Sequence, residues 1–119
     1  MSTKLHIASI SWLLASLGHT LAAKDWQSLP EFRKLPGLAY TCAKAGWYQG
    51  SAFLLVAALL NYHWAQNPEA LSLPANQGVA ALLAGIMGVS SGWYLKNGVR
   101  RTGIVVAVMG AVQAWAVWV

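Results

Sequence analysis

Four polar residues within otherwise apolar stretches are the candidates for chemistry: His19, Gln49, Ser90 and Tyr94. The imidazole of His19 can take up or release a proton near neutral pH, so this residue is the candidate catalytic acid or base. An amide, a hydroxyl and a phenol can orient a substrate, so Gln49, Ser90 and Tyr94 are the candidate substrate-binding residues. The alternative is that His19 packs between helices, hydrogen-bonded to Gln49 or to a serine.

The remaining polar residues predict structure rather than chemistry. Asn61 and Gln113 carry neutral amides that join helices more often than they bind ligands. His19 would lie toward the cytoplasmic face of the membrane and His6 and His63 toward the other face, and Cys42 is the only cysteine, so no metal site is expected. Nucleotide-binding loops, Cys-x-x-Cys pairs and nucleophile elbows are missing from the sequence, so we expect no cofactor.

The composition is that of a membrane protein. The chain is 57% hydrophobic and 9% charged, whereas a soluble domain has about 25% charged residues to keep its surface wet. The net charge of +5 does not indicate nucleic-acid binding, because no polar surface carries basic and aromatic residues together.

Four stretches have about the 20 apolar residues that a helix needs to cross a bilayer. They cover residues 5–23, 46–65, 76–95 and 102–119. Helices are expected because lipid offers no partner for unpaired backbone groups. The predicted fold is therefore all-α, a membrane-spanning four-helix bundle that forms a single domain over residues 1–119. Cleavage of the first stretch as a signal peptide is the alternative for that segment.

The basic residues predict an orientation. Seven of the eight Lys and Arg residues lie in the first and third connectors between the stretches, and only Lys4 lies elsewhere. The positive-inside rule puts those two connectors in the cytoplasm and both termini on the other side of the membrane. In a eukaryote the expected location is the endoplasmic reticulum membrane.

Small residues recur at helical spacing on the last three stretches, where they would let helices approach closely. We expect these stripes to fill the inside of the bundle, and a seam between copies of the chain is the alternative. They are Gly46, Gly50, Ala57 and Asn61; Gly78, Ala81, Gly85, Gly88 and Gly92; and Gly103, Ala107, Gly110 and Ala114.

Three strings of the sequence carry a resemblance: Leu-Gly-His-Thr at 17–20, Gly-Trp-Tyr-Gln-Gly-Ser at 46–51 and Leu-Leu-Asn-Tyr-His-Trp-Ala at 59–65. With them the chain resembles small uncharacterised fungal integral membrane proteins with four helices. That resemblance implies a fold but brings no catalytic residues. Accessory enzymes of fungal natural-product pathways, including cofactor-free anthrone oxygenases, are similar in size and topology only.

The leading interpretation is an accessory or structural membrane component without a catalytic motif. The first alternative is a membrane-embedded enzyme, an isomerase, cyclase or cofactor-free oxygenase, that acts on a lipophilic substrate. The second alternative is a small transporter or channel subunit, although no stretch contains the acidic residue that a proton-coupled exchanger needs. The expected partners are membrane lipids, a lipophilic small molecule and a second copy of the chain, and no nucleic acid.

Overall fold

The computed structural model describes residues 2–119, and its regular elements are helices. Four of them are long: α1 (Thr3–Gln27), α3 (Gly37–Gln66), α4 (Pro74–Lys96) and α5 (Arg100–Trp118). Two short ones lie in the connections: α2 (Pro30–Arg33) and the 3₁₀ helix η1 (Pro68–Ser72). The all-α prediction is confirmed, and the ranges predicted to span a membrane lie within the long helices, apart from the terminal Val119.

Local sequence explains where the helices begin and end. Proline opens α2 and α4 because a residue in the first turn has no intrahelical partner for its N–H. The Ser2 side chain caps α1 by accepting a hydrogen bond from the Leu5 N–H. After α4, Gly98 adopts a φ of 78°, which only glycine adopts without steric cost and which reverses the chain into α5.

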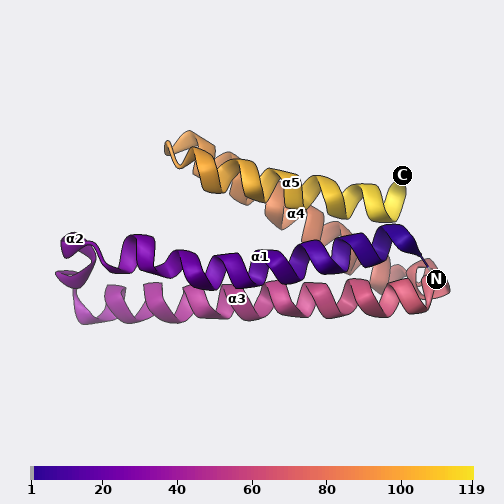
Figure 1. The fold of residues 1–119 in the computed structure, drawn as a ribbon, viewed down its shortest axis with the longest axis horizontal. Coiled ribbons are helices and arrows are strands. Elements are labelled where there is room, and N and C mark those ends of the chain that lie inside the picture. Colours follow the sequence, from indigo (N-terminus) through magenta and orange to yellow (C-terminus); the bar gives the residue numbers. More distant parts are fainter. Residues whose placement is uncertain (1) are drawn as a thin grey trace.

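The long helices form two antiparallel hairpins (Figure 1). Helices α1 and α3 pack side by side along their length, and α4 packs on α5. The hairpins are joined covalently through η1 and by packing of α5 on α1. This end also holds both chain termini, so we call it the terminal end. At the opposite end the α4–α5 hairpin diverges from α1 and α3 (Figure 1).

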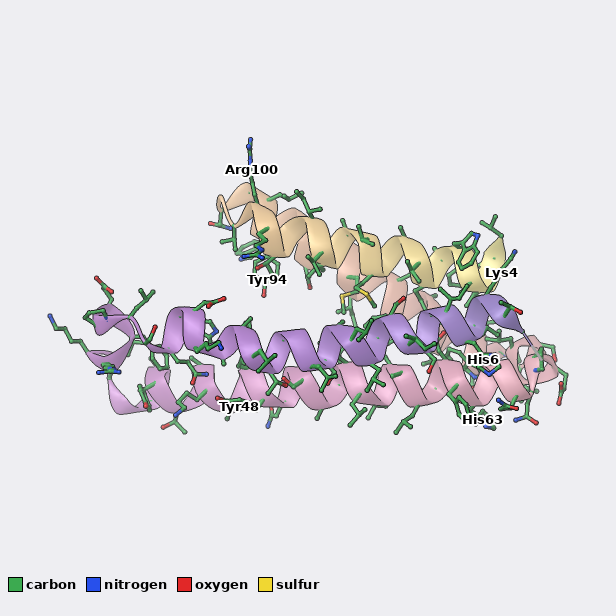
Figure 2. The ribbon with its side chains drawn as sticks, viewed as in Figure 1. Lys4, His6, Tyr48, His63, Tyr94 and Arg100 are labelled. Carbon is green, nitrogen blue, oxygen red and sulfur yellow. The ribbon has the colours of Figure 1, made fainter. Side chains whose placement is uncertain are left out.

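The diverging end carries most of the positive charge. The α1–α3 connection and the α4–α5 turn both lie there, so seven of the eight Lys and Arg residues belong to that half of the molecule. We call it the basic end. Figure 2 shows Arg100 and Tyr94 there, with Lys4, His6 and His63 at the terminal end.

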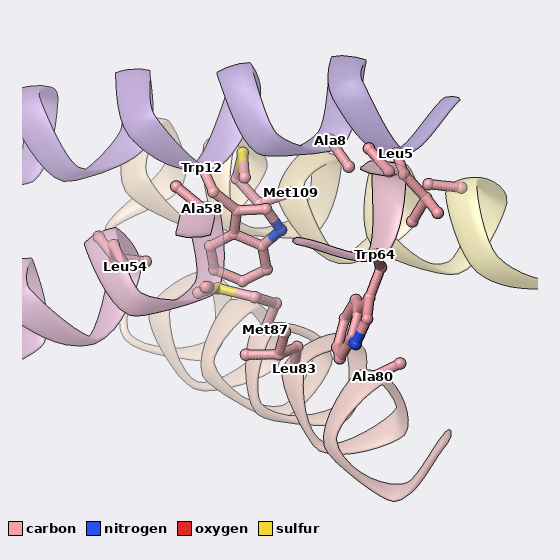
Figure 3. Packing of buried hydrophobic residues seen from close by; sticks show 13 residues of the cluster. Leu5, Ala8, Trp12, Leu54, Ala58, Trp64, Ala80, Leu83, Met87 and Met109 are labelled. Atoms are coloured by element: carbon pink, nitrogen blue, oxygen red, sulfur yellow. The ribbon is translucent and has the colours of Figure 1, made fainter. Parts of the chain in front are cut away.

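Apolar side chains from all four long helices meet in the half nearer the terminal end (Figure 3). Trp12 of α1 is fully buried and lies beside Met109 of α5 and Met87 of α4. Trp64 of α3, also fully buried, packs near Leu83 of α4. Flexible methionines and flat indoles fill the space between helices that cross at an angle.

Three of the long helices, α1, α4 and α5, are long and apolar enough to cross a membrane. Helix α3 is long enough, with 30 residues, but it does not reach the hydropathy of the other three helices. It carries Ser51 and Asn61, which are buried toward the other helices, and the exposed polar residues Gln49 and His63. The lower hydropathy of α3 therefore comes partly from polar groups that do not face its surroundings.

The three small-residue stripes do not share one role. Gly103 and Gly110 of α5 are buried, and a Cβ on Gly110 would lie 3.1 Å from the Met87 Cβ. On α3 a Cβ on Gly50 would lie 3.1 Å from the His19 ring, so this glycine is also needed for close packing. On α4 the expectation of a bundle-filling stripe is wrong, because a Cβ on each of its glycines would meet nothing within 4 Å. They are Gly78, Gly85, Gly88 and Gly92.

Candidate functional site

A cleft of about 490 Å³ lies at the basic end, and its lining residues belong to both hairpins. Both hairpins contribute to its walls: α1 and α3 on one side, and α4, α5 and the turn between them on the other. Its lining residues are Ala22, Asp25, Trp26, Ala43, Trp47, Tyr94, Val99 and Thr102. A volume of this size falls within the range of small-molecule sites, about 300–1,000 Å³.

The aromatic wall on the α1–α3 side is held rigidly by its own contacts. The Trp47 ring stacks on the His19 ring at 3.8 Å between centroids, and its Nε1–H donates a 2.8 Å hydrogen bond to the His19 carbonyl. Trp26 meets Trp47 edge to face at 5.1 Å and Phe32 at 4.8 Å. Because each of these rings packs on another ring of the protein, a ligand that enters the cleft has little side-chain freedom to remove.

His19 itself lies behind this wall, in the interface between α1 and α3. Its Nδ1 is 2.9 Å from the Ser51 Oγ, and the Thr20 hydroxyl donates to the same Ser51 oxygen at 2.9 Å. Ser51 can accept from Thr20 and donate to His19, which leaves the proton of the imidazole on Nε2. The ring is therefore engaged in packing with Trp47 and Gly50 and does not line the cleft.

The other three candidate residues lie in three different places. Tyr94 lines the cleft and lies on the α4–α5 hairpin in Figure 2. Gln49 is exposed on α3, and Ser90 lines a separate open groove along α4 with Gly85. Of the candidates chosen from the sequence, only Tyr94 belongs to the cleft, and His19 touches it indirectly through Trp47.

Polar groups in the other half of the molecule join the hairpins. The Gln113 Oε1 accepts hydrogen bonds from the Trp12 Nε1–H at 2.7 Å and from the Asn61 amide at 2.8 Å. All three side chains are fully buried, and Asn61 also donates to the Ala57 carbonyl at 2.9 Å. The prediction that Asn61 and Gln113 join helices is confirmed. We call Trp12, Asn61 and Gln113 the polar clamp.

Asp25, Trp26 and Thr102 were not singled out in the sequence as site residues. Asp25 and Trp26 were placed in a connector after residue 23, whereas α1 continues to Gln27 and carries both along the cleft. Pro30 is the signal in the sequence for a longer helix. A charged residue that faces water, such as Asp25, does not end a helix, whereas a proline does, so the helix could be expected to continue almost to Pro30.

The lining of the cleft carries few polar groups. Asp25 is its one ionisable carboxylate, and the phenol of Tyr94 and the hydroxyl of Thr102 are further polar groups. Among residues 2–119 no three His, Cys, Asp or Glu side chains gather to hold a metal. An aromatic cleft with a single acid can hold a ligand and orient it.

Comparison with protein-family models, with curated proteins and with solved structures found no match to this chain.

Proposed function

We propose that this chain is an integral membrane protein that crosses the bilayer four times and holds a lipophilic molecule in the cleft at its basic end. In this proposal it is an accessory component that binds its ligand without transforming it. The observation that carries the proposal is the cleft itself, an aromatic-walled space of about 490 Å³ between two hairpins. Clefts between helices are common ligand sites in bundles.

The fourth span is inferred from the pairing of α3 with α1. The Ser2 N–H donates to the Ala65 carbonyl at one end of this pair, and the Tyr48 hydroxyl donates to Gln27 near the other. Helix α3 is about 45 Å long at 1.5 Å per residue, and α1 is one of the three apolar helices. Any membrane that α1 crosses is then crossed by α3 as well.

The orientation proposed is the one that the charges favour, with the basic end in the cytoplasm. The lone Cys42 is exposed on α3, in the half of the molecule with the basic end. A membrane-impermeant maleimide should label it in inverted vesicles and not in right-side-out vesicles. Ser72→Cys in a Cys42→Ala background is the matched probe, because Ser72 is exposed in the opposite connector.

The two probes should label from opposite sides. Labelling of both cysteines from the same side would refute the crossing by α3, and labelling of Cys42 from outside would refute the orientation.

Binding is tested with a neutral, photoactivatable long-chain alcohol added to the purified protein in maltoside micelles. The proposal expects its cross-links to concentrate in the peptides that line the cleft, around residues 22–26, 43–47 and 94–102. Even labelling of every apolar surface, with no preference for those peptides, would refute a binding cleft.

A specific contact favours the enzyme as the second candidate. The His19 imidazole and the Ser51 hydroxyl are 2.9 Å apart, the arrangement of a base beside a nucleophile. Ser51 is 9% exposed and does not line the cleft. A fluorophosphonate probe that labelled Ser51 and lost its label in His19→Ala would favour this candidate over the accessory role.

The transporter alternative is disfavoured by the packing around the polar clamp. Buried apolar side chains surround the clamp, so they interrupt a polar path between the two ends of the molecule.

A further inference from the structure

We infer that the cleft at the basic end takes the phosphocholine headgroup of a phospholipid. This inference rests on the proposed function, because it names the ligand of the same cleft. It combines two features of that end of the molecule: the lining of the cleft is aromatic and acidic, and basic residues lie next to the lining in the chain.

The lining suits an organic cation. Trp26, Trp47 and Tyr94 each bring an aromatic ring to the walls, and Asp25 brings a carboxylate. Aromatic rings attract quaternary ammonium groups through their negative faces, and a nearby carboxylate adds to that attraction. Neither Lys nor Arg is among the described residues of the lining, so an anion placed there would face Asp25 without a counter-charge.

The surround suits a phosphate. Lys24 precedes Asp25 in the chain, and Arg100 and Arg101 lie between Val99 and Thr102 of the lining. All three basic residues are exposed, but the Arg100 side chain points away from α1 and α3 in Figure 2. We therefore assign the phosphate to Lys24 and Arg101, which are next in the chain to Asp25 and Thr102 of the lining. A zwitterionic headgroup, with its ammonium inside and its phosphate at the mouth, matches both charges.

Rigidity and size agree with this ligand. Trp47 is fixed by its stack on His19 and its hydrogen bond to the His19 carbonyl, and Trp26 is fixed against Trp47 and Phe32. A preformed aromatic wall loses little freedom when a ligand enters. The cleft of about 490 Å³ holds a headgroup and the glycerol region, while the acyl chains extend along the apolar helices into the bilayer.

The experiment measures competition with the neutral photoactivatable alcohol for labelling of the cleft peptides in maltoside micelles. The competitors are phosphatidylcholine, phosphatidylethanolamine and phosphatidylglycerol with identical acyl chains. We expect phosphatidylcholine to halve the labelling at a concentration at least ten times lower than the other two. We also expect free phosphocholine in water to compete far more weakly than the lipid.

Variants separate the headgroup contact from folding. Asp25→Asn and Tyr94→Leu should each reduce the tenfold preference to less than threefold. The matched controls are Glu31→Gln, an exposed acid at the same end outside the lining, and Trp93→Leu, an aromatic that neighbours Tyr94 but is 69% exposed. Both controls should keep the full preference. Helical circular dichroism and a single chromatographic peak confirm that each variant folds.

Two results would overturn the inference while leaving the proposed function intact: equal competition by the three lipids, or stronger competition by phosphatidylglycerol. Equal competition by free phosphocholine would also overturn it, since the ligand would then be soluble. Absence of preferential cleft labelling by the alcohol in the wild-type protein would instead refute the proposed function.

Discussion

Replacing Gln113 by leucine removes the acceptor through which three helices are joined. The Gln113 Oε1 receives the Trp12 Nε1–H at 2.7 Å and the Asn61 amide at 2.8 Å, so one oxygen connects α1, α3 and α5. Leucine has a similar size and no polar atom, so the packing around the site is largely kept. The change therefore tests the hydrogen bonds more than the packing.

The magnitude follows from the partners left behind. An interhelical hydrogen bond in a membrane protein contributes about 0.6 kcal/mol on average and about 1.7 at most. After the substitution Asn61 retains its bond to the Ala57 carbonyl, whereas the fully buried Trp12 indole loses the partner described for it. The substitution also removes the 3.2 Å hydrogen bond that the Gln113 Nε2–H donates to the Asn61 Oδ1. Three lost bonds, one of which leaves the Trp12 donor without its partner, give an expected destabilisation of about 2 kcal/mol. That loss is roughly a thirtyfold change in the unfolding equilibrium.

The assay is reversible unfolding by dodecyl sulfate in mixed micelles, followed by circular dichroism. Gln49→Leu is the matched control, because it removes the same side chain from an exposed position and should change stability by less than about 0.5 kcal/mol. A double-mutant cycle with Asn61→Leu should give a coupling of about 0.6–1.7 kcal/mol. Equal stability of Gln113→Leu and Gln49→Leu would refute the polar clamp.

Two further substitutions test the packing in the same assay. Gly110→Val should lower the free energy of unfolding by about 1–3 kcal/mol, because the valine side chain would press on Met87. The control Gly85→Val lies in an open groove and should change that free energy by less than about 0.5 kcal/mol. Equal destabilisation by the two variants would contradict the assignment of the buried and open faces. His19→Ala should lower stability and reduce labelling of the cleft by the photoactivatable alcohol, because Trp47 loses the ring on which it stacks. His19→Phe, which keeps a flat ring there, should restore most of the labelling, and no difference between the two variants would show that the stack does not position Trp47.

The helices could be predicted from the sequence because their signals are local. Pro30 and Pro74 open helices, and Gly98 reverses the chain in a conformation that favours glycine. Helix α3 begins at Gly37, directly after Pro36 and before the predicted span at residue 46. Proline and glycine act within a turn of their own position, so no tertiary contact is needed to read them.

The faces of the helices could not be predicted in the same way. In a soluble protein the polar face of a helix marks the outside, but a helix in lipid is apolar all round and its hydropathy does not distinguish the two sides. Gly103 and Gly110 of α5 pack inward although Ala107 of the same stripe is exposed, and Gly88 of α4 lies open. Whether a small residue faces inward depends on how the side chains of neighbouring helices, such as Met87, pack against it. That packing is a tertiary property, so it cannot be deduced from one helix alone.

The candidate site was only partly predictable for a related reason. The alternative in which His19 packs between helices and is hydrogen-bonded to a serine agrees with its contact to Ser51. The position of a polar residue within an apolar stretch does not say which side of the helix it occupies, so Gln49 is a candidate from the sequence although it is exposed on α3. Tyr94 lines the cleft because the α4–α5 hairpin diverges from α1 at the basic end (Figure 1). No local sequence pattern predicts that divergence.

The position of the polar clamp explains why the cleft between the hairpins lies at the basic end. Gln113 lies six residues before the last residue of the chain, about 9 Å along the helix axis, so the hydrogen bonds between hairpins are concentrated near the terminal end. The covalent link through η1 is at the same end. Towards the basic end, Trp26 and Trp47 line one side of the space between the hairpins and Tyr94 the other. The two hairpins are joined at the terminal end and diverge at the basic end (Figure 1), and the cleft is lined by residues of both hairpins there. Loosening the clamp should therefore alter ligand binding at a distance, whereas substitutions on the open face of α4 should not.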